Sequence, residues 1–160
     1  MPAVRKVRGL RGLGGMALVL LLPTSLPFNA FAALGGPASS VAVDQTRMKA
    51  MRQVKAGTAF NIHEITTDTG TVVREYVSSA SGQVFAVTWQ GPFMPDLKQV
   101  LGDHFATFVE STGQERIGRG HALVSRPEVV IHSGGHMRSF TGKAYLPGQL
   151  PEGVRIEDIR

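Results

Sequence analysis

The chain has 160 residues, no cysteine and a formal net charge of +5. This length suits one ordinary domain, and the lack of cysteine excludes a disulfide framework and thiol chemistry. Four of the 17 basic residues lie at the very start of the chain, namely Arg5, Lys6, Arg8 and Arg11. The rest of the chain has 13 basic residues and 12 acidic ones. The nearly neutral remainder lacks the persistent cationic patch that nucleic-acid binding needs, so we expect no nucleic acid as a partner.

Residues 1–32 have the organisation of a secretory signal peptide. A basic start precedes an apolar run from Gly12 to Leu22, and Ala30 to Ala32 gives the small residues of an A-x-A cleavage site. This run of about eleven residues is shorter than the roughly 20 that span a bilayer, so an uncleaved anchor is the weaker alternative. We predict cleavage between Ala32 and Ala33. No Arg-Arg pair marks the twin-arginine route, so we expect general secretory export to the periplasm or the exterior.

Residues 33–43 are rich in small residues, glycine and proline, and predict a flexible start to the mature chain. We expect residues 44–160 to fold as a single α+β domain. Its first predicted element is a helix from Asp44 to Ala56, with Gly57 as the stop. Basic residues surround this helix, whereas a membrane-surface helix gathers them on one face. We favour a solvated helix, with peripheral membrane contact as the alternative, and expect no transmembrane helix in the mature chain.

Residues 59–89 predict a β-meander of three strands. The runs Phe60 to Thr66, Thr71 to Val77 and Val84 to Trp89 are rich in β-branched and aromatic residues. Turn-forming residues separate them. The third run is apolar on both of its faces, which indicates a central strand that is covered on both sides.

Asp96 to Ser111 is the best helix of the sequence. Asp96 and Gln99 have the spacing of a capping box, and Gly113 is a suitable stop. Gly102 inside the helix costs about 1 kcal/mol relative to alanine. One apolar stripe predicts that the helix lies across a sheet face; it consists of Leu97, Val100, Leu101, His104, Phe105 and Phe108.

Residues 112–127 predict a loop with a short extended piece near Ala122 to Val124. Glu128 to Leu146 predicts a β-hairpin, because its apolar residues alternate around Gly134-Gly135, a favoured two-residue turn. Together these elements predict a mainly antiparallel sheet of about five strands. One amphipathic helix packs on it, and a second helix precedes it in the chain.

The histidines of this hairpin are the sharpest candidates for chemistry. His132 and His136 have a spacing that could hold a divalent metal if their side chains share a face. A two-residue turn at Gly134-Gly135 sends the two rings to opposite faces, whereas a three-residue turn brings them together. The first register matches the apolar faces better. We therefore expect no metal and no cofactor, with His132 and His136 kept as weak candidates.

The exposed hairpin tip is the candidate binding site that remains: Ser133, Gly134, Gly135, His136 and Arg138. A hydrolase needs a nucleophile, a base and an orienting acid. Ser133 lies near His136 in the sequence, but no G-x-S-x-G motif accompanies it. We name no catalytic residue and favour a protein that is not an enzyme. The alternative is a small periplasmic enzyme or metal-binding protein that uses His136 with His132 or Ser133.

Three blocks of sequence resemble a known family. They are G-T-V-V-R-E-Y-V (Gly70 to Val77), V-F-A-V-T-W-Q-G-P with P-D-L and L-G (Val84 to Gly102), and S-G-G-H-M-R-S-F-T-G-K-A-Y-L-P with L-P-E-G-V and D-I-R (Ser133 to Arg160). The chain resembles the exported proteobacterial family known as domain of unknown function 2844. The resemblance implies a class and a compartment but no catalytic residues. We expect an exported accessory or binding protein of the cell envelope, whose partner is an envelope protein or a ligand.

Overall fold

The computed structural model describes residues 34–113 and 120–160. The predicted signal peptide, with its cleavage site at Ala32 and Ala33, lies outside these residues. The described chain forms one seven-stranded sheet in the order β1-β2-β3-β4-β7-β6-β5, in which all neighbours are antiparallel. The strands are β1 (Met51–Lys55), β2 (Phe60–Thr66), β3 (Val72–Ser78), β4 (Val84–Gly91), β5 (Ala122–Ser125), β6 (Val130–His136) and β7 (Ser139–Tyr145).

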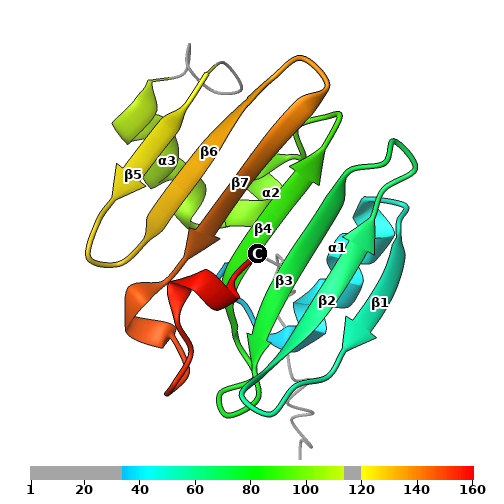
Figure 1. The fold of residues 1–160 in the computed structure, drawn as a ribbon, viewed down its shortest axis with the longest axis vertical. Helices are drawn as coiled ribbons and strands as arrows, with labels where there is room; N and C mark the ends of the chain where they lie inside the picture. The colour runs from blue at the N-terminus through cyan, green and yellow to red at the C-terminus, as the bar shows by residue number, and fades with distance from the viewer. Residues whose placement is uncertain (1–33, 114–119) are drawn as a thin grey trace, which may run out of the picture.

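The helices lie on one face of this sheet (Figure 1). They are η1 (Ala38–Ser40), α1 (Val41–Arg47), α2 (Leu97–Leu101) and α3 (His104–Thr112). Of the described residues, the C-terminal segment lies on the other face, with the short 3-10 helices η3 (Pro147–Gln149) and η4 (Ile156–Asp158). We call the two sides the covered face and the open face. The α+β prediction is confirmed, but the predicted count of about five strands is too low. None of the helices in the described ranges is long and apolar enough to cross a membrane.

Strand alternation divides the core into two parts. The larger cluster lies between the covered face and the helices and includes Val87 and Trp89 of β4. The smaller cluster lies on the open face, where Ile159 of the C-terminal segment packs with Tyr76 and Tyr145. The first six residues of β4 are buried, because β4 contributes to both clusters. The prediction of a central, covered strand is therefore correct.

The predicted helix from Asp44 to Ala56 is wrong. Helix α1 ends at Arg47, Lys49 adopts a positive φ of 49°, and β1 follows. All five residues of β1 are exposed, because it is an edge strand. Its sequence therefore lacks the alternation of apolar and polar residues that marks a half-buried strand. The membrane-surface alternative rested on one continuous basic helix, which this part of the chain does not form.

Residues 34–43, expected to be a flexible start, pack against the sheet. Leu34 and Val41 are buried in the larger cluster. The Gly35 N–H donates to the Val84 carbonyl at 2.8 Å, and the Val84 N–H donates to the Gly36 carbonyl at 2.8 Å. These bonds extend the sheet by a short bridge, which explains how a glycine-rich stretch is held in place.

The predicted helix from Asp96 to Ser111 is interrupted. Gly102 has φ 54° and separates α2 from α3, so the chain turns where the sequence suggested only a weak point. Asp96 caps α2 as predicted, because its side chain accepts from the N–H groups of Lys98 at 2.9 Å and Gln99 at 3.3 Å. The second half of the predicted capping box does not form, since the Gln99 side chain donates to Asp44 instead. Most of the predicted apolar stripe is buried: Leu97, Val100, Leu101 and Phe108.

The hairpin of β6 and β7 is confirmed, but its predicted turn is wrong. His136 pairs with Ser139, so the turn is Met137-Arg138, with Arg138 at φ 63°. Gly134 lies inside the strand. A Cβ atom at Gly134 would lie only 2.5 Å from Nδ1 of His121, which occupies the space above it. Close packing, rather than a turn, accounts for a glycine at this position.

Candidate functional site

A row of polar side chains crosses the open face. Arg74 of β3 pairs with Thr88 of β4, Thr88 pairs with Lys143 of β7, and Lys143 pairs with His132 of β6. Directly opposite residues of antiparallel strands have Cβ atoms about 4.5–5.5 Å apart and point to the same side. These four side chains are therefore neighbours on the open face. We call them the polar row.

A second line of residues runs beside the polar row. Gln90 of β4 pairs with Thr141 of β7, and Thr141 pairs with Gly134 of β6. Each lies two residues along its strand from a member of the polar row, so it points to the same face. Because Gly134 has no side chain, the imidazole of His121 lies over its backbone. The open face is thus polar across four strands, β3, β4, β7 and β6.

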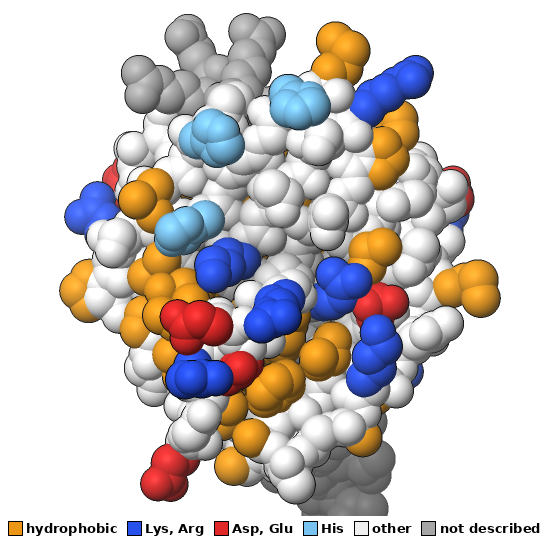
Figure 2. All heavy atoms as spheres, viewed as in Figure 1, with side chains coloured by type: hydrophobic (Ala, Val, Ile, Leu, Met, Phe, Trp, Pro, Cys, Tyr) orange, Lys and Arg blue, Asp and Glu red, His pale blue; other side chains and the backbone are white. Residues whose placement is uncertain are grey.

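These two lines of residues form the floor of a hollow of about 420 Å³. Its walls come from the start of β5 at one end and from the C-terminal segment at the other. Figure 2 looks onto this face, where basic and histidine side chains gather. The lining consists of Arg74, Thr88, Trp89, Gln90, His121, Ala122, Leu123, His132, Ser133, Gly134, Thr141, Gly142, Lys143, Ile159 and Arg160.

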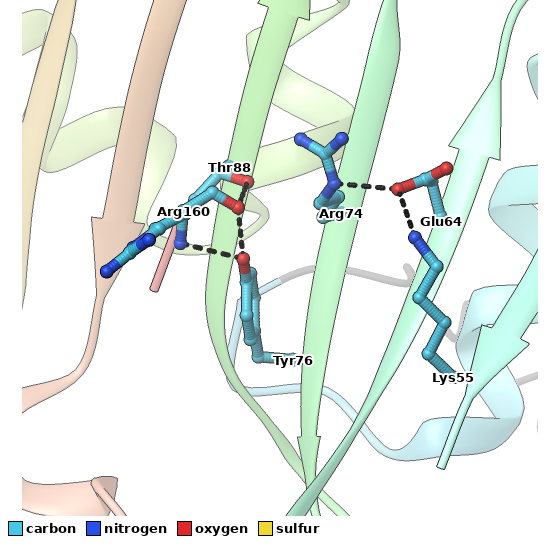
Figure 3. Close-up of polar contacts among 6 residues, drawn as sticks. All are labelled: Lys55, Glu64, Arg74, Tyr76, Thr88 and Arg160. Carbon is cyan, nitrogen blue, oxygen red and sulfur yellow. Dashed lines mark hydrogen bonds and ion pairs between the residues drawn. The ribbon is translucent and has the colours of Figure 1, made fainter. Parts of the chain in front are cut away.

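The lining contains cations but no carboxylate side chain. The nearest acid in the row is Glu64 of β2, which pairs in register with Arg74. Glu64 accepts from Nε of Arg74 at 2.7 Å and from Nζ of Lys55 at 3.2 Å (Figure 3). The hydrogen bond from Arg74, with help from Lys55, lowers the pKa of the Glu64 carboxyl group. Glu64 thus remains charged beside the hollow, where two cations already hold it.

Lys143 differs from Arg74 in having no acidic partner. It is half-buried in the middle of the polar row, between Thr88 and His132. Within residues 34–113 and 120–160 it forms no ion pair and no hydrogen bond. Its ammonium group therefore adds an uncompensated positive charge to the hollow.

The wall at the C-terminal side is fixed by main-chain hydrogen bonds (Figure 3). The Arg160 N–H donates to the Tyr76 hydroxyl at 2.9 Å, and this hydroxyl donates to the Arg160 main-chain oxygen. Thr88 Oγ1 donates to the same oxygen at 3.2 Å. Ile159 is buried in the smaller core cluster and anchors the segment beside these bonds. The wall is therefore part of the folded core.

A family comparison applies to this chain. The family of proteins of unknown function DUF2844 matches residues 30–159. The chain belongs to the DUF2844 family. No curated protein and no solved structure matches it.

The three blocks that resemble the DUF2844 family meet in the hollow. The first block contributes Arg74, the second contributes Thr88 and Gln90, and the third contributes Lys143 and Arg160. The blocks come together because β7 pairs with β4, which lies far from it in the sequence, as well as with its sequence neighbour β6. The hollow thus unites the parts of this DUF2844 chain that are separated along the sequence.

The structure separates the pairs of residues that the sequence suggested for chemistry. His132 and His136 point to the same face, but four residues of strand place them about 13 Å apart. Ser133 is buried and alternates to the covered side, so it does not meet His136. His136 and Arg138 are exposed at the end of the hairpin, away from the hollow lining. No group of three His, Cys, Asp or Glu residues in the described chain could hold a metal ion.

Part of the predicted tip nevertheless belongs to the hollow. His132, Ser133 and Gly134 line it, whereas Gly135, His136 and Arg138 do not. Sequence reasoning missed its other polar residues, of which the chief ones are Arg74, Thr88, Gln90, Thr141 and Lys143. A signal exists for four of them, since Thr88 and Gln90 flank Trp89 in β4, and Thr141 and Lys143 flank Gly142 in β7. The order of the strands, which brings them together, cannot be read from that alternation.

A second polar group lies beneath the covered face. Asp44 of α1 is 0% exposed, and Glu75 of β3 is 2% exposed. Nε2 of Gln99 in α2 donates to Oδ1 of Asp44 at 2.5 Å, whereas Oδ2 of Asp44 and Oε2 of Glu75 are buried without a hydrogen-bond partner among the described residues. Burial raises the pKa of Asp44 to about 6, and burial followed by the charge of Asp44 raises the pKa of Glu75 well above its ordinary value. We call Asp44 and Glu75 the buried pair; it ties α1 and α2 to the sheet and does not reach solvent.

Proposed function

We propose that this DUF2844 protein is an exported binding protein of the cell envelope and that the hollow is its ligand site. The observation that carries the proposal is a hollow of about 420 Å³ on the open face of the sheet, which none of the described α-helices covers. This volume falls within the range of about 300–1,000 Å³ that is common for small-molecule sites. The polar side chains project from the paired central strands β3, β4, β7 and β6, so the site is organised before a ligand arrives.

Export is supported by the organisation of residues 1–32. A basic start, a short apolar run and an A-x-A site direct a chain through the general secretory route. Cell fractionation followed by N-terminal sequencing tests this part of the proposal. The expected product starts at Ala33 in the periplasm or the medium. An unprocessed chain in the cytoplasm would contradict it.

The chemistry of the lining supports binding rather than turnover. It offers positive charge from Lys143 and hydrogen-bonding groups from Thr141 and Gln90. Ser133, the nucleophile considered from the sequence, is buried, and its side chain points to the covered face rather than to the hollow. General acid–base or nucleophilic catalysis needs partners within hydrogen-bonding reach of each other. The lining is better suited to recognising a polar molecule than to activating a nucleophile.

A screen of small molecules by thermal shift, followed by amide chemical-shift mapping, tests the site. Replacing the exposed Thr141 by Trp fills the hollow from its floor. The matched control is His136→Trp, which lies at the hairpin end outside the lining. Molecules that stabilise the wild type should no longer stabilise Thr141→Trp but should still stabilise His136→Trp. Ligands that bind both variants equally well, or a protein that turns over the molecules it binds, would refute the proposal.

A further inference from the structure

The charge of the hollow narrows the class of ligand. Resting on the proposed binding function, we infer that the ligand carries an anionic oxygen group, a carboxylate or a phosphate, which Lys143 and Arg74 bind from two sides. The Thr88 hydroxyl is not available to this group, because it donates to the main-chain oxygen of Arg160. The lining brings together the cations Arg74, Lys143 and Arg160 without one acidic side chain. A recess with cations and low-dielectric walls concentrates the field and attracts anions.

Lys143 is the first contact. Its stem lies between two paired strands, with Thr88 on one side and His132 on the other. Neither neighbour is an acid, and the described part of the chain supplies no carboxylate to its ammonium group. A lysine on an open edge would lie in bulk water, whereas this one is half-buried in the floor of a recess. An anionic group of a ligand would give the Lys143 ammonium group the ion-pair partner that the described residues do not supply.

Arg74 is the second contact. Its Nε donates a hydrogen bond to Glu64 at 2.7 Å, and its two terminal nitrogens form no bond to Glu64 (Figure 3). A guanidinium group presents several donors in a fixed plane, so it can hold one carboxylate while it offers donors to another anion. Glu64 fixes the orientation of Arg74 and is itself held by Lys55. This arrangement positions the guanidinium group without placing an acid in the hollow.

The spacing suits one anionic group. Arg74 and Lys143 are two strands apart, about 10 Å between their backbones, with Thr88 between them. Two long side chains that lean toward each other can span this distance around a carboxylate or phosphate. Thr141 and Gln90 in the second line of residues remain for hydroxyl or amide groups of the same molecule. The inferred ligand is thus a small polar acid rather than an apolar molecule.

The test titrates the purified ¹⁵N-labelled protein with acetate, inorganic phosphate and acetamide at constant ionic strength. Acetamide has the shape of acetate but no charge. We expect acetate, phosphate or both to shift the amide signals of residues 88, 141 and 143, while acetamide leaves them in place. Stronger binding of acetate identifies a carboxylate ligand, and stronger binding of phosphate identifies a phosphate ligand.

Variants make the test specific. Lys143→Gln should weaken anion binding about tenfold, because it removes a charge-assisted contact, and Lys143→Arg should restore most of it. Lys98→Gln is the matched control, since Lys98 is an exposed lysine of α2 on the covered side. Equal affinity of wild type and Lys143→Gln, or equal shifts with acetamide and acetate, would overturn the inference. If neutral molecules still lose their binding in Thr141→Trp, the proposed function stands and only the ligand class is wrong.

Discussion

The two faces of the sheet handle charge in opposite ways, although neighbouring residues of one strand supply both. Arg74 and Glu75 follow each other in β3 and therefore point to opposite faces. Glu75 is buried beneath the helices beside Asp44, and burial, followed by the charge of Asp44, raises the pKa of Glu75 and favours a protonated carboxyl group. Arg74 faces solvent and keeps its charge beside Glu64.

This difference separates stability from recognition. A charge on the covered face must be neutralised within the protein, because removing it from water costs several kcal/mol when it is unpaired. A cation on the open face remains hydrated and can exchange water for a ligand at little cost to the fold. Changes on the covered face should therefore alter the free energy of unfolding, and changes on the open face should alter binding.

The largest effect should come from the core of the covered face. Trp89→Ala removes a side chain that is 1% exposed and packs across Gly142 of the next strand. Deleting an aromatic side chain of this kind costs about 3–5 kcal/mol. Leu123→Ala on the open face, where Leu123 is 65% exposed, should change stability by less than about 0.5 kcal/mol. Urea unfolding measures both, and similar losses would contradict the division between the faces.

The buried pair should give the covered face a pH-dependent stability. The pKa of Asp44 is raised from 3.8 to about 6, so the folded state binds more protons than the unfolded state in this range. Its contribution is fully present below pH 4 and is lost as the pH rises through about 6. Asp44→Asn removes this titration while its amide oxygen can still accept from Gln99.

Urea unfolding of wild type and Asp44→Asn between pH 4 and pH 8 measures this effect. The difference in unfolding free energy should move in favour of the variant by on the order of 2 kcal/mol across this range. Taking the difference cancels carboxyl groups that titrate independently of Asp44, such as Glu64, whose pKa is lowered. The difference includes the change at Glu75, whose pKa is raised in part by the charge of Asp44. A difference that stays constant with pH would show that Asp44 is not perturbed by its burial.

The C-terminal wall should respond to the loss of one hydroxyl group. Tyr76→Phe removes the group that both donates to and accepts from the main chain of Arg160. We expect a loss of about 1 kcal/mol and faster hydrogen exchange in residues 155–160. Tyr145→Phe is the control, because Tyr145 packs in the same cluster but its hydroxyl forms no hydrogen bond among the described residues. Equal hydrogen-exchange rates in the two variants would show that the Tyr76 hydroxyl does not hold the C-terminal wall in place.

Local sequence signals predicted much of this fold. The strands of the meander, the Asp96 cap and the existence of the hairpin follow from alternation, turn residues and capping spacing. Each of these signals acts within a few residues of its element. By contrast, β1 is an exposed edge strand whose residues show no burial pattern. The break at Gly102 likewise depends on how α2 and α3 pack on the sheet.

The site was less predictable because it depends on strand order. The sequence drew attention to the hairpin tip, and only His132, Ser133 and Gly134 of those candidates line the hollow. Thr88 and Lys143 become neighbours through the pairing of β4 with β7, which joins distant parts of the chain. The prediction of the turn was wrong for a related reason. The space beside Gly134 is filled by His121, which directly precedes β5. Contacts of this range leave no local pattern.

Two glycines of the hairpin give the smallest and most direct test of the two faces. A Cβ at Gly142 would meet the ring of the buried Trp89 and would lie 2.6 Å from the main-chain oxygen of His132. A Cβ at Gly134 would instead meet the imidazole of His121, at 2.5 Å. The imidazole can rotate toward solvent, whereas the backbone and a packed indole cannot. Gly134→Ala should therefore cost less than about 1 kcal/mol, and Gly142→Ala about 1–3 kcal/mol.

Thermal unfolding measures the stabilities, and the imidazole signals of His121 report its movement in Gly134→Ala. We expect these signals to change in Gly134→Ala while the signals of buried side chains stay in place. The reverse order of stabilities would mean that His121 is held as firmly as a core residue. The hollow would then have a fixed wall at this end, so that its shape as well as its charge would select ligands.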